Sequence, residues 1–310
     1  MEKILFDHAF YIKLGEGGKY EKDCLQDNCL RLGYREVTHE LCLAGRWDEA
    51  KKSLVSAYPE MDDPTAKNHI RQVRTFYEAN ETCIWITFID EKLYWGHAKK
   101  EIRQLTDKSK VRPIVGKWSC KDTKGETLYE KKLSGKITKT KGYQGTICPI
   151  KDDAFAYLLR KINGDKIPEV EEAIDSKNNL ELKIGKLLTH LQPYDFEILV
   201  ELIFTRAGLQ KISQTGGTQK GIDIRLSSPI TGEEYFVQVK SKSDYSEYLK
   251  YKQISMDEGY SRFFFVVHTP KGDLSKKKIS EQMEDLWLAS DVAKLAIKYG
   301  LAEWIIDRTG

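Results

Sequence analysis

The sequence predicts two parts of different fold class, a β-rich α+β part followed by an α/β part with a small mixed sheet. The chain has 310 residues, which is more than one ordinary compact domain needs. Short aromatic and β-branched runs dominate residues 1–150, whereas helical and strand patterns alternate after Pro193. We therefore expect one domain over 1–150 and another over 191–310, joined by a helical linker over 151–190.

Composition limits the class of protein. Apolar residues make up 40% of the chain and charged residues 31%, which is typical of a globular protein. The net charge of +3 does not by itself indicate a nucleic-acid binder, so any basic surface must come from local clustering. We find neither an apolar run of about 20 residues nor a signal peptide, and we expect a cytoplasmic protein without a membrane span.

The first part is expected to contain short strands and two helices. A hairpin is expected over 88–95, and many short strands with inserted helices suggest a small, partly open barrel. The expected strands are 10–14, 29–34, 83–88, 92–98, 127–133 and 145–150, and the expected helices are 47–58 and 64–77.

All six cysteines lie in this first part, and in a reducing cytoplasm they should be free thiols. Cys24, Cys29, His39 and Cys42 could be arranged as zinc ligands, but they lack the tight C-x2-C spacing of structural zinc sites. Ordinary buried thiols are the favoured interpretation.

The last part is expected to begin with an amphipathic helix over 194–207 that ends at Gly208. A glycine-rich loop over 216–221 precedes the first strand. The remaining elements are expected as strands over 222–226, 235–240 and 262–268, with helices over 243–256 and 277–299.

Asp223, Gln238 and Lys240 form the candidate catalytic group. Asp223 stands between two isoleucines in a strand, where a carboxylate is costly unless it is paired. Strand alternation places Gln238 and Lys240 on one face of the next strand, and a hairpin can bring all three side chains together. With the carbonyl of Val239, the oxygens of Asp223 and Gln238 suit a hard divalent cation, and a nearby lysine suits phosphodiester hydrolysis. Glu197 is a candidate fourth member.

These residues carry a resemblance to a known family. The run Pro193-Tyr194-Asp195-Phe196-Glu197, then Gly208, then Gly221-Ile222-Asp223-Ile224 and Val237-Gln238-Val239-Lys240 resembles the Mrr-like restriction endonucleases of the PD-(D/E)XK superfamily. The resemblance covers about residues 185–300. It implies a restriction-endonuclease-like fold, Asp223, Gln238 and Lys240 as catalytic core, and Mg²⁺ as the ion, with Mn²⁺ as a substitute. Gln238 replaces the acidic residue of the wider superfamily, which should weaken metal binding.

The alternative for an isolated Asp and Gln-x-Lys is a structural ion pair on a solvated sheet face. The glycine loop and the order of elements favour the nuclease. Four lysines are expected to flank the cleft and contact DNA phosphates, although a solvated helix face would also account for them. They are Lys220, Lys242, Lys250 and Lys252.

Aromatic and basic residues are interleaved in the first part, which suits nucleic acid. The layout around Phe76-Tyr77, the strand 84–88 and Tyr94-Trp95-Gly96 is similar to the PUA-like group, which includes the EVE, YTH and SRA modified-base readers. That resemblance implies a pocket in which a flipped base stacks. The candidate pocket residues are Trp47, Trp85, Tyr94, Trp95 and Trp118, and the alternative is that these rings only fill a core.

Together the two resemblances imply a modification-dependent, type IV-like restriction endonuclease that defends against foreign double-stranded DNA such as that of phage. Modified cytosine is the expected target. Because one site per chain cuts one strand, we expect a homodimer. Two alternatives stay open, a DNA-repair or structure-specific nuclease and a non-cleaving protein that binds modified DNA.

Overall fold

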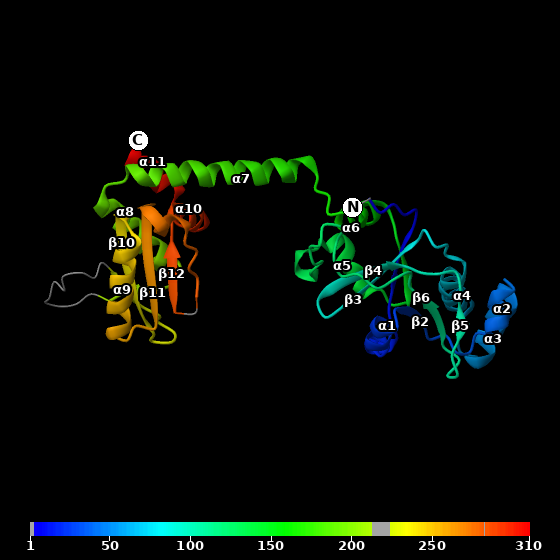
Figure 1. Cartoon of the computed structure of the whole chain (residues 1–310). Helices are drawn as coiled ribbons and strands as arrows, with labels where there is room; N and C mark the ends of the chain where they lie inside the picture. The colour runs from blue at the N-terminus through cyan, green and yellow to red at the C-terminus, as the bar shows by residue number, and fades with distance from the viewer. Residues whose placement is uncertain (1–2, 213–223, 282) are drawn as a thin grey trace. The chain divides into compact units, whose positions relative to one another are not determined.

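The computed structural model describes residues 3–212, 224–281 and 283–310. The chain forms two compact units, Met1–Ile167 and Pro168–Gly310 (Figure 1). The predicted linker 151–190 is helical and contains the boundary between them. Its first helix, α6 (Asp152–Ile162), packs in the first unit, and its second, α7 (Pro168–Leu187), packs in the second. No helix in the described part of the chain is long and apolar enough to cross a membrane.

The first unit is built on two small sheets. The larger has the order β4 (Lys92–His97), β3 (Ile84–Ile89), β1 (Ala9–Ile12) and β7 (Ile147–Ile150), with β1 parallel to β3 and the other pairs antiparallel. The smaller is antiparallel, with the order β2 (Cys29–Leu32), β6 (Lys110–Pro113) and β5 (Arg103–Gln104). The helices and 3-10 turns are α1 (Glu21–Gln26), α2 (His39–Leu43), α3 (Trp47–Ala57), α4 (Asp63–Glu78), α5 (Gly135–Thr138), η1 (Glu16–Gly18), η2 (Glu130–Lys132) and η3 (Lys139–Gly142).

The two faces of the larger sheet cover separate cores. Trp85 of β3 points into a core shared with α3 and α4, whereas Ile84 and Ile86 point into a second core shared with α6. This alternation follows from the two-residue period of a strand. The predicted hairpin is confirmed, because β3 and β4 pair across Asp90 and Glu91, both of which have positive φ angles (47° and 57°).

Two expectations for this unit need correction. The predicted strand 127–133 is absent; residues there form the turn η2, and Tyr129 makes only an isolated bridge to Lys92. Strands β5 and β6 and the short helices α1, α2 and α5 were not predicted from the sequence. Among the described residues the two sheets remain open, and no closed barrel forms.

The second unit is an α/β fold with a mixed five-stranded sheet, as predicted. The strand order is β12 (Glu284–Trp287), β11 (Arg262–Pro270), β10 (Glu234–Ser243), β9 (Ile224–Ser227) and β8 (Gln210–Lys211). Strands β10, β11 and β12 are parallel, and β8 and β9 complete the sheet in antiparallel pairs. The other elements are α8 (Pro193–Arg206), α9 (Tyr245–Asp257), α10 (Ala289–Lys298), α11 (Ala302–Thr309), η4 (Leu188–His190) and η5 (Gly272–Lys276).

Helices cover both faces of this sheet (Figure 1). One face packs against α8 and α10 through Val237, Val239 and Val266. The other packs against α9 through Phe236, Phe265 and the two tyrosines Tyr248 and Tyr251. Buried parallel strands with helices on both faces are the expected consequence of apolar runs such as Arg262–Pro270.

The prediction of one helix over 277–299 was wrong. The segment contains β12 and then α10, separated by Leu288. Residues 284–287 of β12 pair with 263–266 of β11, which would otherwise leave its backbone groups unpaired on that side. The Asp291 carboxylate accepts a hydrogen bond from the Leu288 backbone N–H (3.0 Å), which fixes the start of α10.

Candidate active site

Strand β10 supplies the centre of the candidate site. Its side chains alternate, so Phe236, Gln238 and Lys240 face α9, while Val237 and Val239 face α8. Gln238 is fully buried (0% exposed) opposite Phe265 of β11. Burying a side-chain amide without hydrogen bonds costs about 1–3 kcal/mol. A glutamine buried in a strand therefore indicates that its polar atoms bind a partner.

Lys240 lies further along the same strand, on the same face as Gln238. Its Nζ atom lies 5.4 Å from the centroid of the buried Tyr251 ring of α9. A cation above an aromatic ring is attracted by the negative face of that ring. The ammonium group therefore lies against α9, on the face of β10 to which strand alternation also assigns Gln238.

Of the three remaining acidic or basic residues predicted for the nuclease site away from β10 and α9, the structure describes one. Asp223 and Lys220 lie outside the described residues, so their positions stay predictions. Glu197 is half-buried on α8, beside the fully buried Phe196. The Phe196 ring contacts His268 of β11 edge-on, with the centroids 4.7 Å apart. Since β11 pairs Val267 with Lys240, this contact places the first turns of α8 near the same end of the sheet as Lys240.

His268 and Ser241 are polar residues that were not predicted from the sequence. His268 is buried at the end of the parallel strands, with its Nδ1 2.8 Å from Thr269 Oγ1, and the Ser241 hydroxyl is also shielded from solvent. Neither His268 Nε2 nor Ser241 Oγ has a hydrogen-bond partner among the described residues. Burial lowers the pKa of His268, and the nearby charge of Lys242 lowers it further, so the ring is neutral at pH 7. The signal available in the sequence was a histidine that ends an otherwise apolar strand.

The lysines predicted to contact DNA differ in their surroundings. Lys242 and Lys250 are exposed, and Lys250 Nζ lies 5.6 Å from the centroid of the Tyr251 ring. Lys252 instead binds Glu284 of β12 (2.7 Å), a carboxylate that also accepts a hydrogen bond from Tyr248 (2.6 Å). That ion pair joins α9 to the edge of the sheet, and it gives Lys252 a structural partner.

The possible zinc ligands of the first unit do not form a metal site. Across the described residues, no group of three or more His, Cys, Asp or Glu side chains is placed to hold a metal ion. Cys24 and Cys29 lie close to each other, and their contact raises the pKa of the Cys24 thiol and lowers that of Cys29. Cys42 is buried, and His39 Nδ1 lies 2.6 Å from the Tyr77 hydroxyl.

The structure does not bring the five candidate base-pocket residues into one cavity. Trp85 and Trp118 are buried in the core beneath α3 and α4, and Trp47 and Tyr94 pack against that core. Trp95 packs against the second core on the opposite face of the larger sheet, and its Nε1 donates to the Lys121 carbonyl (2.8 Å).

Two of the basic residues near these aromatics are buried. Lys110 Nζ donates to the carbonyls of Tyr34 and Val37, and the Arg112 guanidinium donates to the carbonyls of Phe76 (2.9 Å) and Ala79 (2.6 Å) at the end of α4. Both side chains are 0% exposed. They therefore stabilise the fold, and the basic surface of this unit is smaller than the sequence suggests.

Comparison with known proteins bears on the second unit. Residues 188–255 match the family model Mrr_cat, described as a restriction endonuclease. The chain contains a Mrr-like restriction endonuclease domain. The matched residues run from η4 to α9, and they include Gln238 and Lys240 on β10. The Mrr-like domain therefore contains the buried amide and the lysine that define the candidate site.

The other similarities of the chain are weak. No curated protein sequence matches it. Among solved structures, the chain is similar to one titled DNA modification-dependent restriction endonuclease AspBHI, with 10% sequence identity and a TM-score of 0.30, over 73% of this chain and 68% of that one. A TM-score of this size does not establish a common fold.

Proposed function

We propose that the second unit is a divalent-metal-dependent endodeoxyribonuclease whose catalytic residues are Asp223, Gln238, Lys240 and Glu197. The observation that carries this proposal is the restriction endonuclease family match over residues 188–255. It is supported by the placement of Gln238 and Lys240 on one face of β10, at the end of the sheet that α8 also reaches. Asp223 is joined directly to Ile224, whose partner on β10 is Val237, the neighbour of Gln238.

The proposed donor set fits a hard cation. Asp223 and Glu197 offer carboxylates, Gln238 an amide oxygen and Val239 a backbone carbonyl, and oxygen ligands of this kind suit Mg²⁺, with Mn²⁺ as a substitute. When bound, such a cation polarises the scissile phosphate and lowers the pKa of a bound water. The neutral amide of Gln238 leaves the site with less negative charge than a carboxylate would, so we expect a millimolar rather than micromolar requirement for metal, to order of magnitude.

Lys240 has a separate role in this proposal. Its ammonium group, held against Tyr251, stabilises the negative charge that develops on the phosphate as the phosphodiester bond breaks. The exposed Lys242 and Lys250 are placed to bind the DNA backbone near the same strand and helix. Lys252 is a weaker candidate for that role because Glu284 already binds it.

At the scale of the whole protein, we propose modification-dependent restriction of foreign double-stranded DNA by a cytoplasmic homodimer. The first unit would read the modified base, with modified cytosine as the first candidate. Because Trp85 and Trp118 are buried, Trp47, Tyr94 and Trp95 are the three aromatic candidates whose half-buried rings leave surface for a base. Trp47 and Tyr94 pack against one core and Trp95 against another, so we expect at most two of the three to line the same pocket.

The decisive experiment compares Lys240→Ala with Lys298→Ala, an exposed lysine on α10. Loss of one preorganised charge at the reacting phosphate typically costs about 10²–10³ in kcat. We expect Lys240→Ala to lower the Mg²⁺-dependent nicking and cutting rate by that factor while Lys298→Ala cuts normally. Supercoiled plasmids with unmodified or modified cytosine or adenine serve as substrates, and gel analysis gives the rates.

Each other outcome has a clear meaning. Equal cleavage by wild type and Lys240→Ala would exclude Lys240 from catalysis. Tight binding of modified plasmid without cleavage in Mg²⁺ or Mn²⁺ would indicate a non-cleaving reader of modified DNA. Equal cutting of modified and unmodified branched DNA would indicate a repair or structure-specific nuclease.

A further inference from the structure

Helix α7 has an exposed half. Its C-terminal half packs along α10 and α11, where Ile184 is buried. By contrast, every residue from Pro168 to Leu180 is exposed, and this part of the helix extends past the other elements of the second unit (Figure 1). Isolated helical segments of such length are marginal in water, because most helix stability in proteins comes from packing.

The exposed part of α7 carries apolar side chains on one face. Val170, Ile174 and Leu182 are 43%, 37% and 68% exposed, and their spacing places them within about a third of the helix circumference. Asn178 lies on the same face, midway between Ile174 and Leu182. This seam of Val170, Ile174, Asn178 and Leu182 has no covering element among the described residues of its unit.

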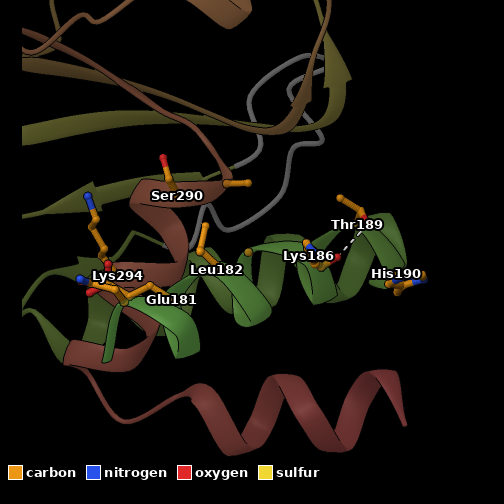
Figure 2. A pocket seen from close by; sticks show the side chains of 10 residues that line it. Glu181, Leu182, Lys186, Thr189, His190, Ser290 and Lys294 are labelled. Carbon is orange, nitrogen blue, oxygen red and sulfur yellow. Dashed lines mark hydrogen bonds between the residues drawn. The ribbon is translucent and has the colours of Figure 1, made fainter. Parts of the chain in front are cut away.

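The seam continues into a groove between α7 and α10. Figure 2 shows Leu182 and Lys186 of α7 on one side of it and Ser290 and Lys294 of α10 on the other. The groove has a volume of about 770 Å³, and its lining includes Gly185 of α7 and Ala289 of α10. A second helix can therefore lie along the seam and place apolar side chains in the groove.

Acidic residues lie near the start of the same helix, and basic residues lie near its end. Its first eight residues, 168–175, include four carboxylates, Glu169, Glu171, Glu172 and Asp175, and no basic residue. Further along, Lys177 pairs with Glu181 (3.6 Å), and Lys183 and Lys186 are exposed. Lys186 lines the same groove as Lys294. The helix is acidic at one end and basic at the other, so it is complementary to itself when reversed.

We propose that α7 pairs with α7 of a second copy of this chain in an antiparallel, two-fold symmetric interface centred near Asn178. In that arrangement Ile174 of each copy opposes Leu182 of the other, and the acidic half of each helix lies against the basic half of its partner. A parallel pairing would instead place carboxylates against carboxylates. An isologous interface of this kind needs one self-complementary patch, which α7 supplies.

The pairing gives a physical basis for the homodimer in the proposed function, but it stands without that function. Two copies joined through α7 carry two candidate sites, one for each DNA strand. The interface itself is independent of metal, DNA and catalysis, so its test can fail or succeed whatever the outcome of cleavage assays.

The experiment measures the mass of the full-length chain by sedimentation velocity, without DNA or metal, over a range of concentration. We expect a dimer whose dissociation constant rises at least about thirtyfold in Ile174→Glu and in Leu182→Glu, since central apolar contacts carry most of such an interface. Ser176→Glu is the matched control, because Ser176 is exposed on the opposite face of the helix, and it should remain dimeric. Far-UV circular dichroism checks that each variant is folded.

Charge reversal tests the direction of the pairing. Glu171 and Lys186 lie at the edge of the seam, at matching levels of an antiparallel pair centred on Asn178. The variant E171K and the variant K186E should each shift toward monomer, because like charges then face each other. Mixed together, the two variants should form a heterodimer, and a chain that carries both changes should form a homodimer again. A monomeric wild type, a dimer insensitive to Ile174→Glu and Leu182→Glu, or a mixture of the reversed variants that stays monomeric would overturn the proposal.

Discussion

At the scale of single residues, the candidate site combines side chains that the sequence identifies with side chains that it does not. Gln238 and Lys240 stand out because a polar pair interrupts an apolar strand. His268 gave no comparable signal, yet the structure buries it on β11, edge-on to the Phe196 ring of α8. Whether a polar residue is buried depends on what packs over it, and that packing comes from a distant helix.

The burial of His268 leads to a prediction about pH. Its pKa in the folded protein is lowered, whereas in the unfolded chain it is about 6.5. As the pH falls through 6.5 the unfolded chain binds the proton first, so the free energy of unfolding decreases until the folded pKa is reached. We expect His268→Phe to remove this decrease, which amounts to on the order of 1 kcal/mol between pH 7 and pH 5.

Chemical denaturation of wild type and His268→Phe at several pH values measures this difference. His39 and His69 also have pKa values lowered by burial, but they are present in both proteins and cancel in the comparison. Parallel curves for the two proteins across this range would show that unfolding does not change the protonation of His268, which would contradict the prediction.

At the scale of elements, strand β6 shows how a basic run can serve the fold. Lys110 and Arg112 alternate with Val111, in a part of the sequence where basic and aromatic residues are interleaved. The structure turns both cations inward, where they bind backbone carbonyls at the ends of other elements. Burial lowers the pKa of both groups, but the carbonyls around them compensate part of the cost of burial.

We expect Arg112→Met to destabilise the first unit by about 3 kcal/mol or more, because it leaves the carbonyls of Phe76, Ala79 and Lys99 without their donor. Arg103→Met on the exposed strand β5 is the control and should change stability by about 0.5 kcal/mol or less. Thermal and urea denaturation measure both. Equal stability of the two variants would mean that water replaces the guanidinium at these carbonyls.

At the scale of the whole molecule, the chain divides at Ile167 into two units that each have their own cores. The family match lies entirely in the second unit. This division suits a protein in which one part recognises DNA and another cuts it, since a base pocket must enclose its ligand and a cleavage site must admit a duplex.

We expect the fragment 168–310 to cut plasmid DNA in Mg²⁺ but to lose any preference for modified DNA. The fragment keeps α7, Gln238 and Lys240, and it lacks all the candidate aromatic residues of the base pocket. Cleavage rates on modified and unmodified plasmids, compared with those of the full chain, measure the preference. A fragment that still prefers modified DNA would place recognition in the second unit.

The sequence by itself predicted the α/β class and mixed sheet of the second unit, the hairpin at Asp90 and the shared face of Gln238 and Lys240. Each of these depends on local periodicity, turn residues or strand alternation, which neighbouring residues determine. Only the tertiary structure decided that 284–287 is a strand, that Arg112 is buried and that Trp85 and Trp95 face different cores. Those outcomes depend on pairing and packing between segments far apart in the chain, where β11 offers a free edge to β12 and the end of α4 offers carbonyls to Arg112.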